Sequence, residues 1–177
     1  LAYGQILSDS AKIYLVTCTP GTEVWSKYGH TGIRVEDPTQ KLDIAFNYGV
    51  FFMGEGFYGK FIKGDTYYQL GIEPYSYFLK SNQRISRITY WQELNLTKDQ
   101  KEKIFEALLI NYRPENRFYH YNFVFDNCAT RPYHLIRNAL QDTIISSYKG
   151  YEGTTFRKAI SHYTGKHSSL QLVLDGA

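Results

Sequence analysis

Cysteine and long apolar runs are scarce in this sequence. Of the 177 residues only two are cysteines, Cys18 and Cys128, which is too few for a disulfide framework, and their spacing matches no zinc-binding pattern. A single disulfide between them stays compatible with the sequence. A membrane-spanning helix needs roughly 20 consecutive apolar residues. The longest candidates, such as 104–110, are shorter and are interrupted by Glu106, so we expect no membrane span.

A strong charge of one sign is also missing. The 20 Lys and Arg residues nearly balance the 17 Asp and Glu residues, and the net charge of +3 is interleaved along the chain. Nucleic-acid binding needs a basic patch or stripe. We therefore expect no nucleic-acid partner. No motif indicates a metal or a cofactor, and nothing indicates an oligomeric state.

Apolar and aromatic residues are plentiful. They make up 43% and 17% of the chain, with 17 Tyr, which is enough for one core and too little for two comfortable domains. We expect a single domain over residues 1–177. The chain begins with Leu1 rather than Met, as a trimmed secretory precursor would.

Local patterns predict an α+β fold with an antiparallel sheet. β-branched and aromatic runs between turn residues predict strands over 12–18, 30–35, 42–52 and 84–91. Thr97 and Gln100 have the spacing of a capping box and predict a helix that ends before Pro114. Two more helices are predicted, one starting between Asn127 and Thr130 and one over 155–163. The Gly-rich, aromatic stretch 53–68 reads as a long loop.

Cys128 is the sharpest chemical signal. A thiol in the first turn of a helix faces unpaired N–H groups and the positive end of the helix dipole, which favour the thiolate. The same N–H groups suit an oxyanion. An ordinary buried cysteine is the alternative. Among the five histidines, His30 is the best partner, because it opens a strand and small glycines flank it.

Asn47 is the expected third member of the site. With a turn centred near Thr39, residue 30 faces residue 47 or 48 across the hairpin. Cys128, His30 and Asn47 would then form a Cys-His-Asn arrangement, in which the amide orients the imidazole. A polar residue on an exposed strand face is the alternative reading of Asn47.

Three segments carry a family resemblance: YGHTGIRV at 28–35, AFNYG at 45–49 and FDNCATR at 125–131. They resemble the periplasmic domain at the N-terminus of the lipoprotein N-acyltransferases of the Bacteroidota, formerly a domain of unknown function. The likeness covers about 13–140. More distantly, a histidine ahead of an Asn-Cys pair is similar to the permuted papain-like group, which includes lecithin:retinol acyltransferase. This implies a permuted papain-like fold, an antiparallel sheet packed against a helix bearing the cysteine.

The resemblance also implies chemistry. An acyl-Cys128 thioester forms with His30 as general base and then acid; a phospholipid is the acyl donor and the amino group of a lipoprotein's N-terminal cysteine is the acceptor. It implies a periplasmic domain at a membrane surface, cut from a longer, membrane-anchored protein. The supporting or substrate-binding positions that it suggests are Asn47, Tyr28, Arg34, Asp126, Asn127 and Arg131. Arg34 and Arg131 suit a phosphate or carboxylate, and equally a structural ion pair.

Two other functions stay open at this point. The same Cys-His pair would serve a cysteine peptidase or amidase that acts on cell-wall peptides, which predicts an open polar cleft instead of an apolar slot beside Cys128. A non-catalytic binding domain would keep Cys128 buried and far from His30. The aromatic stretch 51–68, with Lys60 and Lys63, suits either contact with lipid or packing on the core.

Overall fold

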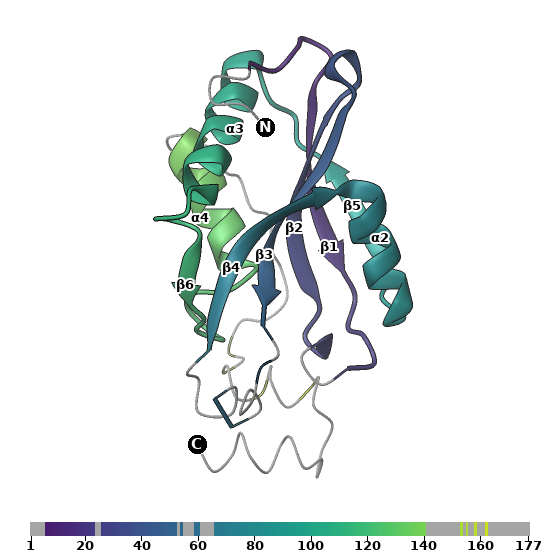
Figure 1. Cartoon of the computed structure of the whole chain (residues 1–177), viewed down its shortest axis with the longest axis vertical. Helices are drawn as coiled ribbons and strands as arrows, with labels where there is room; N and C mark the ends of the chain where they lie inside the picture. Colours follow the sequence, from purple (N-terminus) through teal and green to yellow (C-terminus); the bar gives the residue numbers. More distant parts are fainter. Residues whose placement is uncertain are drawn as a thin grey trace.

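A six-stranded antiparallel sheet with helices on both sides forms the domain (Figure 1). The computed structural model describes residues 6–23, 26–52, 54, 59–60, 66–140, 153, 155, 158 and 162. The strand order is β5-β1-β2-β3-β4-β6. The expected α+β class is therefore confirmed, whereas the permuted papain-like arrangement stays a prediction. The elements are β1 (Lys12–Cys18), β2 (His30–Asp37), the 3-10 helix η2 (Pro38–Gln40), β3 (Leu42–Phe51), β4 (Tyr67–Pro74), α2 (Tyr75–Arg84), β5 (Thr89–Glu93), α3 (Lys98–Tyr112), β6 (Phe118–His120) and α4 (Thr130–Leu140).

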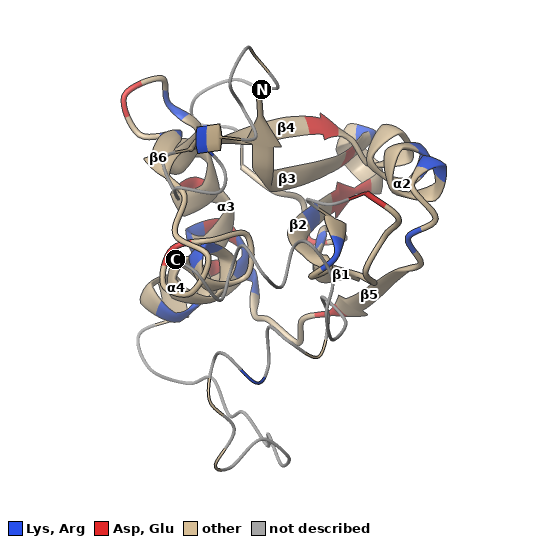
Figure 2. Cartoon of the chain, turned by 90° about the horizontal axis from the view of Figure 1, so that it is seen from below, with Lys and Arg blue, Asp and Glu red and all other residues tan. Residues whose placement is uncertain are grey.

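The two faces of the sheet are both covered, and Figure 2 shows α2 on one side and α3 with α4 on the other. Alternate residues of each strand point to opposite faces. One set packs with α3 and α4 in the larger core; it includes Ile13, Ile33, Phe46, Leu70, Ile104, Phe105, Leu108 and Ile136. The other set packs under α2; it consists of Tyr14, Val16, Cys18, Ala45, Tyr75 and Phe78.

The β2–β3 hairpin is offset from the register expected from the sequence. Its turn is η2, which the buried Asp37 caps by accepting from the Gln40 N–H, and Lys41 closes it with φ 54°. As a result Gly32, not His30, lies directly opposite Asn47. A register shift between Asn47 and Val50 then interrupts the pairing of β3 with β4. Asn47 therefore reaches His30 diagonally, so the prediction of a directly facing pair is wrong in detail.

Two other sequence predictions are corrected. Residues 84–91 do not form one strand, since α2 ends at Arg84 and β5 begins at Thr89. The buried residues Tyr75, Phe78 and Asn82 recur at helical spacing. The strand prediction rested on the alternating pattern over 84–91 and did not take this helical spacing into account. The last two residues of the predicted loop, Tyr67 and Tyr68, belong instead to strand β4, which pairs with both β3 and β6.

The predicted capping box of α3 is confirmed. Thr97 accepts from the Gln100 N–H, and the Gln100 side chain accepts from the Thr97 N–H. Most of the predicted loop 53–65 and of the predicted helix 155–163 lies outside the described residues. In the part of the chain that the structure describes, no helix is long and apolar enough to cross a membrane.

Candidate active site

A pocket of about 340 Å³ lies where β2 begins and β3 ends. His30, Asn47 and Cys128 all line it, as do two of the supporting residues named from the sequence, Tyr28 and Asn127. The structure thus brings together five of the eight candidate residues. The other lining residues include Gly49, Phe51, Tyr68, Glu73, Phe78, Arg87, Tyr121 and Phe123.

Two glycines shape the surroundings of His30, one in the turn before it and one beside its ring. Gly29 has φ +78°, and a Cβ there would lie 2.7 Å from the Cys18 carbonyl oxygen, so only glycine fits the turn that starts β2. A Cβ on Gly49 would lie 2.4 Å from His30 Cε1. The imidazole therefore occupies space that any other residue at position 49 would fill.

Asn47 fixes the orientation of His30. The distance from His30 Nε2 to Asn47 Oδ1 is 2.8 Å. The same oxygen accepts from the Gly49 N–H at 2.9 Å, and Asn47 Nδ2 donates to Glu73 Oε1 at 3.0 Å. A backbone N–H only donates and a carboxylate only accepts. These two partners leave a single orientation for the amide, with its oxygen toward His30.

The amide orientation sets the tautomer of the ring. Because Asn47 offers His30 an acceptor, Nε2 carries a proton and donates it. In the neutral ring the lone pair is then on Nδ1, the nitrogen that remains for the hydrogen bond between His30 and Cys128. A ring nitrogen without a proton, placed beside a thiol, can accept the thiol proton as a general base does.

The segment before α4 holds Cys128 by a network around Asn127. Asn127 Oδ1 accepts from the N–H groups of Ala129 and Thr130, its Nδ2 donates to the Phe123 carbonyl, and its own N–H donates to the Thr130 hydroxyl. This is the bonding of a helix N-cap. It places Cys128 at the first position of the helical turn, and the Asn127 side chain does not take up the Cys128 N–H.

The assigned helix nevertheless begins two residues after the cysteine, at Thr130. The first helical bond runs from the Arg131 N–H to the Asn127 carbonyl. Pro132, the next residue, has no N–H to give to the Cys128 carbonyl. The proline therefore delays the regular helix, and the expected helix bearing the cysteine starts just after it.

The Cys128 thiol has a lowered pKa. Burial of the sulfur raises the pKa, but the His30 charge, a hydrogen bond from that ring and the Thr31 backbone N–H together outweigh burial. Arg87 adds a further positive charge. These contacts favour the thiolate form of Cys128, the form in which a cysteine reacts.

Cys18, the other thiol, has a different environment. It lies opposite His30 on β1 and is 2% exposed. Burial raises the pKa of the Cys18 thiol, and the hydroxyl of Thr89 is its hydrogen-bond partner. Both cysteines are free, so the disulfide that the sequence permitted is not formed.

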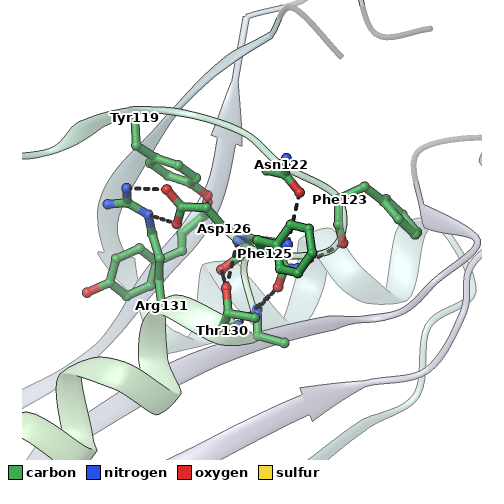
Figure 3. Close-up of polar contacts among 10 residues, drawn as sticks. Tyr119, Asn122, Phe123, Phe125, Asp126, Thr130 and Arg131 are labelled. Atoms are coloured by element: carbon green, nitrogen blue, oxygen red, sulfur yellow. Dashed lines mark hydrogen bonds and ion pairs between the residues drawn. The ribbon is translucent and has the colours of Figure 1, made fainter. Parts of the chain in front are cut away.

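Asp126 and Arg131 do not line the pocket but brace the segment that holds Cys128 (Figure 3). Arg131 binds the Asp126 carboxylate through two parallel bonds of 2.6 and 2.8 Å. Its guanidinium also lies 3.7 Å from the centre of the Tyr119 ring. Tyr119 in turn donates its hydroxyl proton to the Tyr48 carbonyl of β3. The pair therefore ties the cysteine segment to the sheet.

Arg34 lies apart from the pocket. It forms a bidentate pair with Asp43 at 2.7 and 3.0 Å and also contacts Glu36. Its guanidinium lies over the rings of Tyr14 and Tyr75. Of the two roles predicted for Arg34, a phosphate or carboxylate site and a structural ion pair, these contacts correspond to the ion pair.

Glu73, Gly49 and Arg87 are site residues that sequence reasoning missed. Glu73 lies on β4, which the sequence pattern assigned in part to a loop, and it approaches Asn47 only through strand pairing. Arg87 donates to the carbonyls of Ser26 and Gly29 from beyond α2. The AFNYG motif contains Gly49, but its role as clearance for His30 depends on the register of the hairpin.

One family model matches almost the whole chain. It is described as the Lnb N-terminal periplasmic domain and covers residues 2–160, a range that contains His30, Asn47 and Cys128. No curated protein sequence and no solved structure matches the chain. The family resemblance inferred from the three motifs is thereby confirmed, together with the periplasmic location that the description gives. The chain belongs to the family of the Lnb N-terminal periplasmic domain.

Proposed function

We propose that this domain is an extracytoplasmic thiol acyltransferase that carries its acyl group on Cys128. One observation supports the proposal above the others: a partly buried cysteine with a lowered pKa is hydrogen-bonded to a histidine whose orientation an asparagine fixes. Structural cysteines that only fill a core need no such partners. Membership of the Lnb family supports an envelope function for the same site.

The reaction has two halves. The Cys128 thiolate attacks the carbonyl carbon of an acyl ester, and the oxyanion that forms is within reach of the Cys128 N–H at the start of the helical turn. The C–O bond breaks, and His30 Nδ1–H gives its proton to the leaving alkoxide. An amine then attacks the thioester while His30 takes up its proton, the C–S bond breaks, and the products are an amide and the restored pair.

The walls around Cys128 favour an apolar acyl donor. Phe51, Tyr68, Phe78, Tyr121 and Phe123 line the pocket. A second groove of about 350 Å³ shares Phe51 and Tyr68 with it, so the two hollows adjoin. An open polar cleft would favour a peptidase. The aromatic, extended space favours an acyl chain, and a phospholipid is the donor we propose.

Exposed aromatic side chains border the second groove. Phe52, Tyr67 and Phe118 are 82%, 68% and 54% exposed and line it together with Lys60. Aromatic rings beside a lysine suit the headgroup region of a bilayer. We propose that this rim contacts the membrane surface from which the donor comes, and that the acceptor is the N-terminal amine of a lipoprotein.

The test is transfer of a defined acyl chain. The Cys18→Ser chain is incubated with vesicles of one phospholipid, and intact mass is measured. We expect a gain equal to one acyl group, released by neutral hydroxylamine and absent in Cys128→Ala. Adding a peptide with an N-terminal S-diacylglyceryl cysteine should discharge the adduct and yield the N-acyl peptide.

The alternative functions give different results in the same experiment. Cleavage of a cell-wall stem peptide without any lipid adduct would support the cysteine peptidase or amidase. Retention of lipid without a covalent adduct, in the parent and in Cys128→Ala alike, would support a binding domain. Either result would refute the acyltransferase proposal for this chain.

A further inference from the structure

A carboxylate stands behind the proposed Cys128–His30–Asn47 arrangement. Glu73 Oε1 accepts from Asn47 Nδ2 at 3.0 Å, on the side of the amide away from His30. Glu73 also lines the pocket and is the one acidic side chain among the described residues that do. The contacts therefore run in a continuous row from the sulfur to a negative charge.

The sheet register places Glu73 there. Gly71 is directly opposite Asn47 on β4, and Glu73 is two residues farther along the same strand, opposite Ala45. Residues two apart on a strand point to the same face. The side chains of Asn47 and Glu73 are thus diagonal neighbours, a separation that a long side chain spans. The residues next to Asn47 and Glu73 in their strands point to the opposite face of the sheet, so they could not make this contact.

The charge of Glu73 is not matched by a cation among the described residues. Asn47 is its hydrogen-bond partner there, and no Lys or Arg forms an ion pair with it. A structural glutamate on a sheet is commonly paired, as Glu36 is with Arg34. Glu73 instead accepts a hydrogen bond from the neutral amide of Asn47, and the oxygen of that amide contacts the His30 ring.

We propose that Glu73 is a positioning residue of the active site, which acts through Asn47 to hold His30 in its Nε2–H form and to stabilise the imidazolium. The proposal rests on the Cys128–His30 pair described above. A carboxylate beyond the group that orients a histidine strengthens the orientation and favours the charged ring. Substituting Glu73 should therefore shrink the pH range over which the thiolate–imidazolium pair exists.

Other titratable groups around the pair would not mimic this effect. Arginine is charged throughout the accessible pH range, and burial raises the pKa of the surrounding tyrosines and of Cys18. The arginine and the tyrosines keep one charge state between about pH 5 and pH 9, and Cys18 is absent from the Cys18→Ser chain that is measured, so none of these groups titrates in that range. They are Arg87 beyond α2, Cys18 on β1, Tyr28 before β2, Tyr68 on β4, Tyr119 on β6 and Tyr121 after it.

The experiment compares pH profiles of Cys128 alkylation in the Cys18→Ser chain. Glu73→Gln removes the charge but keeps the volume and an acceptor oxygen for Asn47, and Glu73→Ala removes both. Glu115→Gln, on an exposed turn, is the matched control. We expect the upper midpoint, where the imidazolium loses its proton, to fall by about 1 pH unit in Glu73→Gln and to stay in place in the control.

Nitrogen NMR of His30 supplies a second, substrate-free measurement. The neutral parent ring should carry its proton on Nε2, and Glu73→Ala should show a mixture of tautomers. An unchanged upper midpoint in Glu73→Gln, or an unchanged tautomer in a folded Glu73→Ala, would overturn the proposal. Absence of a lipid adduct with both effects present would refute acyl transfer alone and leave the role of Glu73 supported.

Discussion

Gly49→Ala offers a sharp test of the active-site geometry. The added Cβ would lie 2.4 Å from His30 Cε1 and 3.1 Å from Nδ1, while ordinary contacts begin at 3.4 Å. The backbone of Gly49 does not have a positive φ, so alanine meets no backbone strain there. The substitution therefore acts through the added Cβ: the His30 ring has to retreat by about 1 Å or rotate, and Asn47 Oδ1, 3.2 Å from that Cβ, has to give by a few tenths of an ångström.

The expected cost follows from that displacement. Misplacing a reacting group by about 1 Å costs on the order of a hundredfold in rate, and the Cys128 thiolate would lose the hydrogen bond and much of the charge that stabilise it. We expect alkylation of Cys128 at pH 6 to slow by about ten- to a hundredfold. The assay is the rate of iodoacetamide modification in the Cys18→Ser chain, read by intact mass.

The control is another glycine of the same chain. A Cβ on Gly54 meets nothing within 4 Å, so Gly54→Ala should react like the parent. Thermal unfolding of both variants shows whether the fold survives. A folded Gly49→Ala chain that reacts as fast as the parent would refute the inference that the imidazole touches residue 49 and sets the reactivity of the thiol.

Three further predictions concern the same site. In His30→Ala, burial of the sulfur remains while its main counter-charge is lost, so the Cys128 pKa should rise above the ordinary thiol value; a pH profile of alkylation that kept its low inflection would contradict this. Asn127→Ala removes the helix cap and should lower the free energy of unfolding by about 1 kcal/mol, measured by urea denaturation. Arg131→Met breaks the half-buried pair with Asp126 and should cost about 1 kcal/mol, whereas an unchanged midpoint would show that the pair is not stabilising.

The site depends on an irregularity of the sheet. Between Asn47 and Val50 the pairing of β3 with β4 shifts register, as happens at a β-bulge, which bends a strand and redirects its side chains. In this stretch the Gly49 N–H donates to the Asn47 side chain. The bulge thereby supplies both the clearance and one of the two contacts that orient the amide.

Some features of the domain were readable because their causes are local. The α3 capping box depends on two residues three positions apart, and the strands β1, β2 and β3 on runs of β-branched and aromatic side chains. The position of Cys128 ahead of a helix follows from the capping preference of Asn127 and the tolerance of early helix positions for Pro132. The motifs around His30, Asn47 and Cys128 also carried the family resemblance.

Other features depend on register and on contacts between distant strands. β4 was hidden in a stretch rich in turn-forming and aromatic residues, and Glu73 could not be connected with Asn47 before the pairing of β4 with β3 was known. A shift of one residue moves a side chain to the opposite face of a sheet. The expected register of the hairpin was off because η2 and Lys41 leave Asp37 opposite Leu42 and Gly32 opposite Asn47, a pairing that composition does not predict.

The sequence by itself determined the α+β class, the family and the two residues that we propose to react, since each is encoded in short segments of characteristic composition. The tertiary structure decided which nitrogen of His30 faces the thiol, which amide orients it, and which carboxylate stands behind that amide. It also moved Arg34 out of the site and made Asp126 and Arg131 a brace for Cys128. These choices depend on distances between side chains from strands and turns far apart in the chain, and only packing of the folded sheet sets such distances.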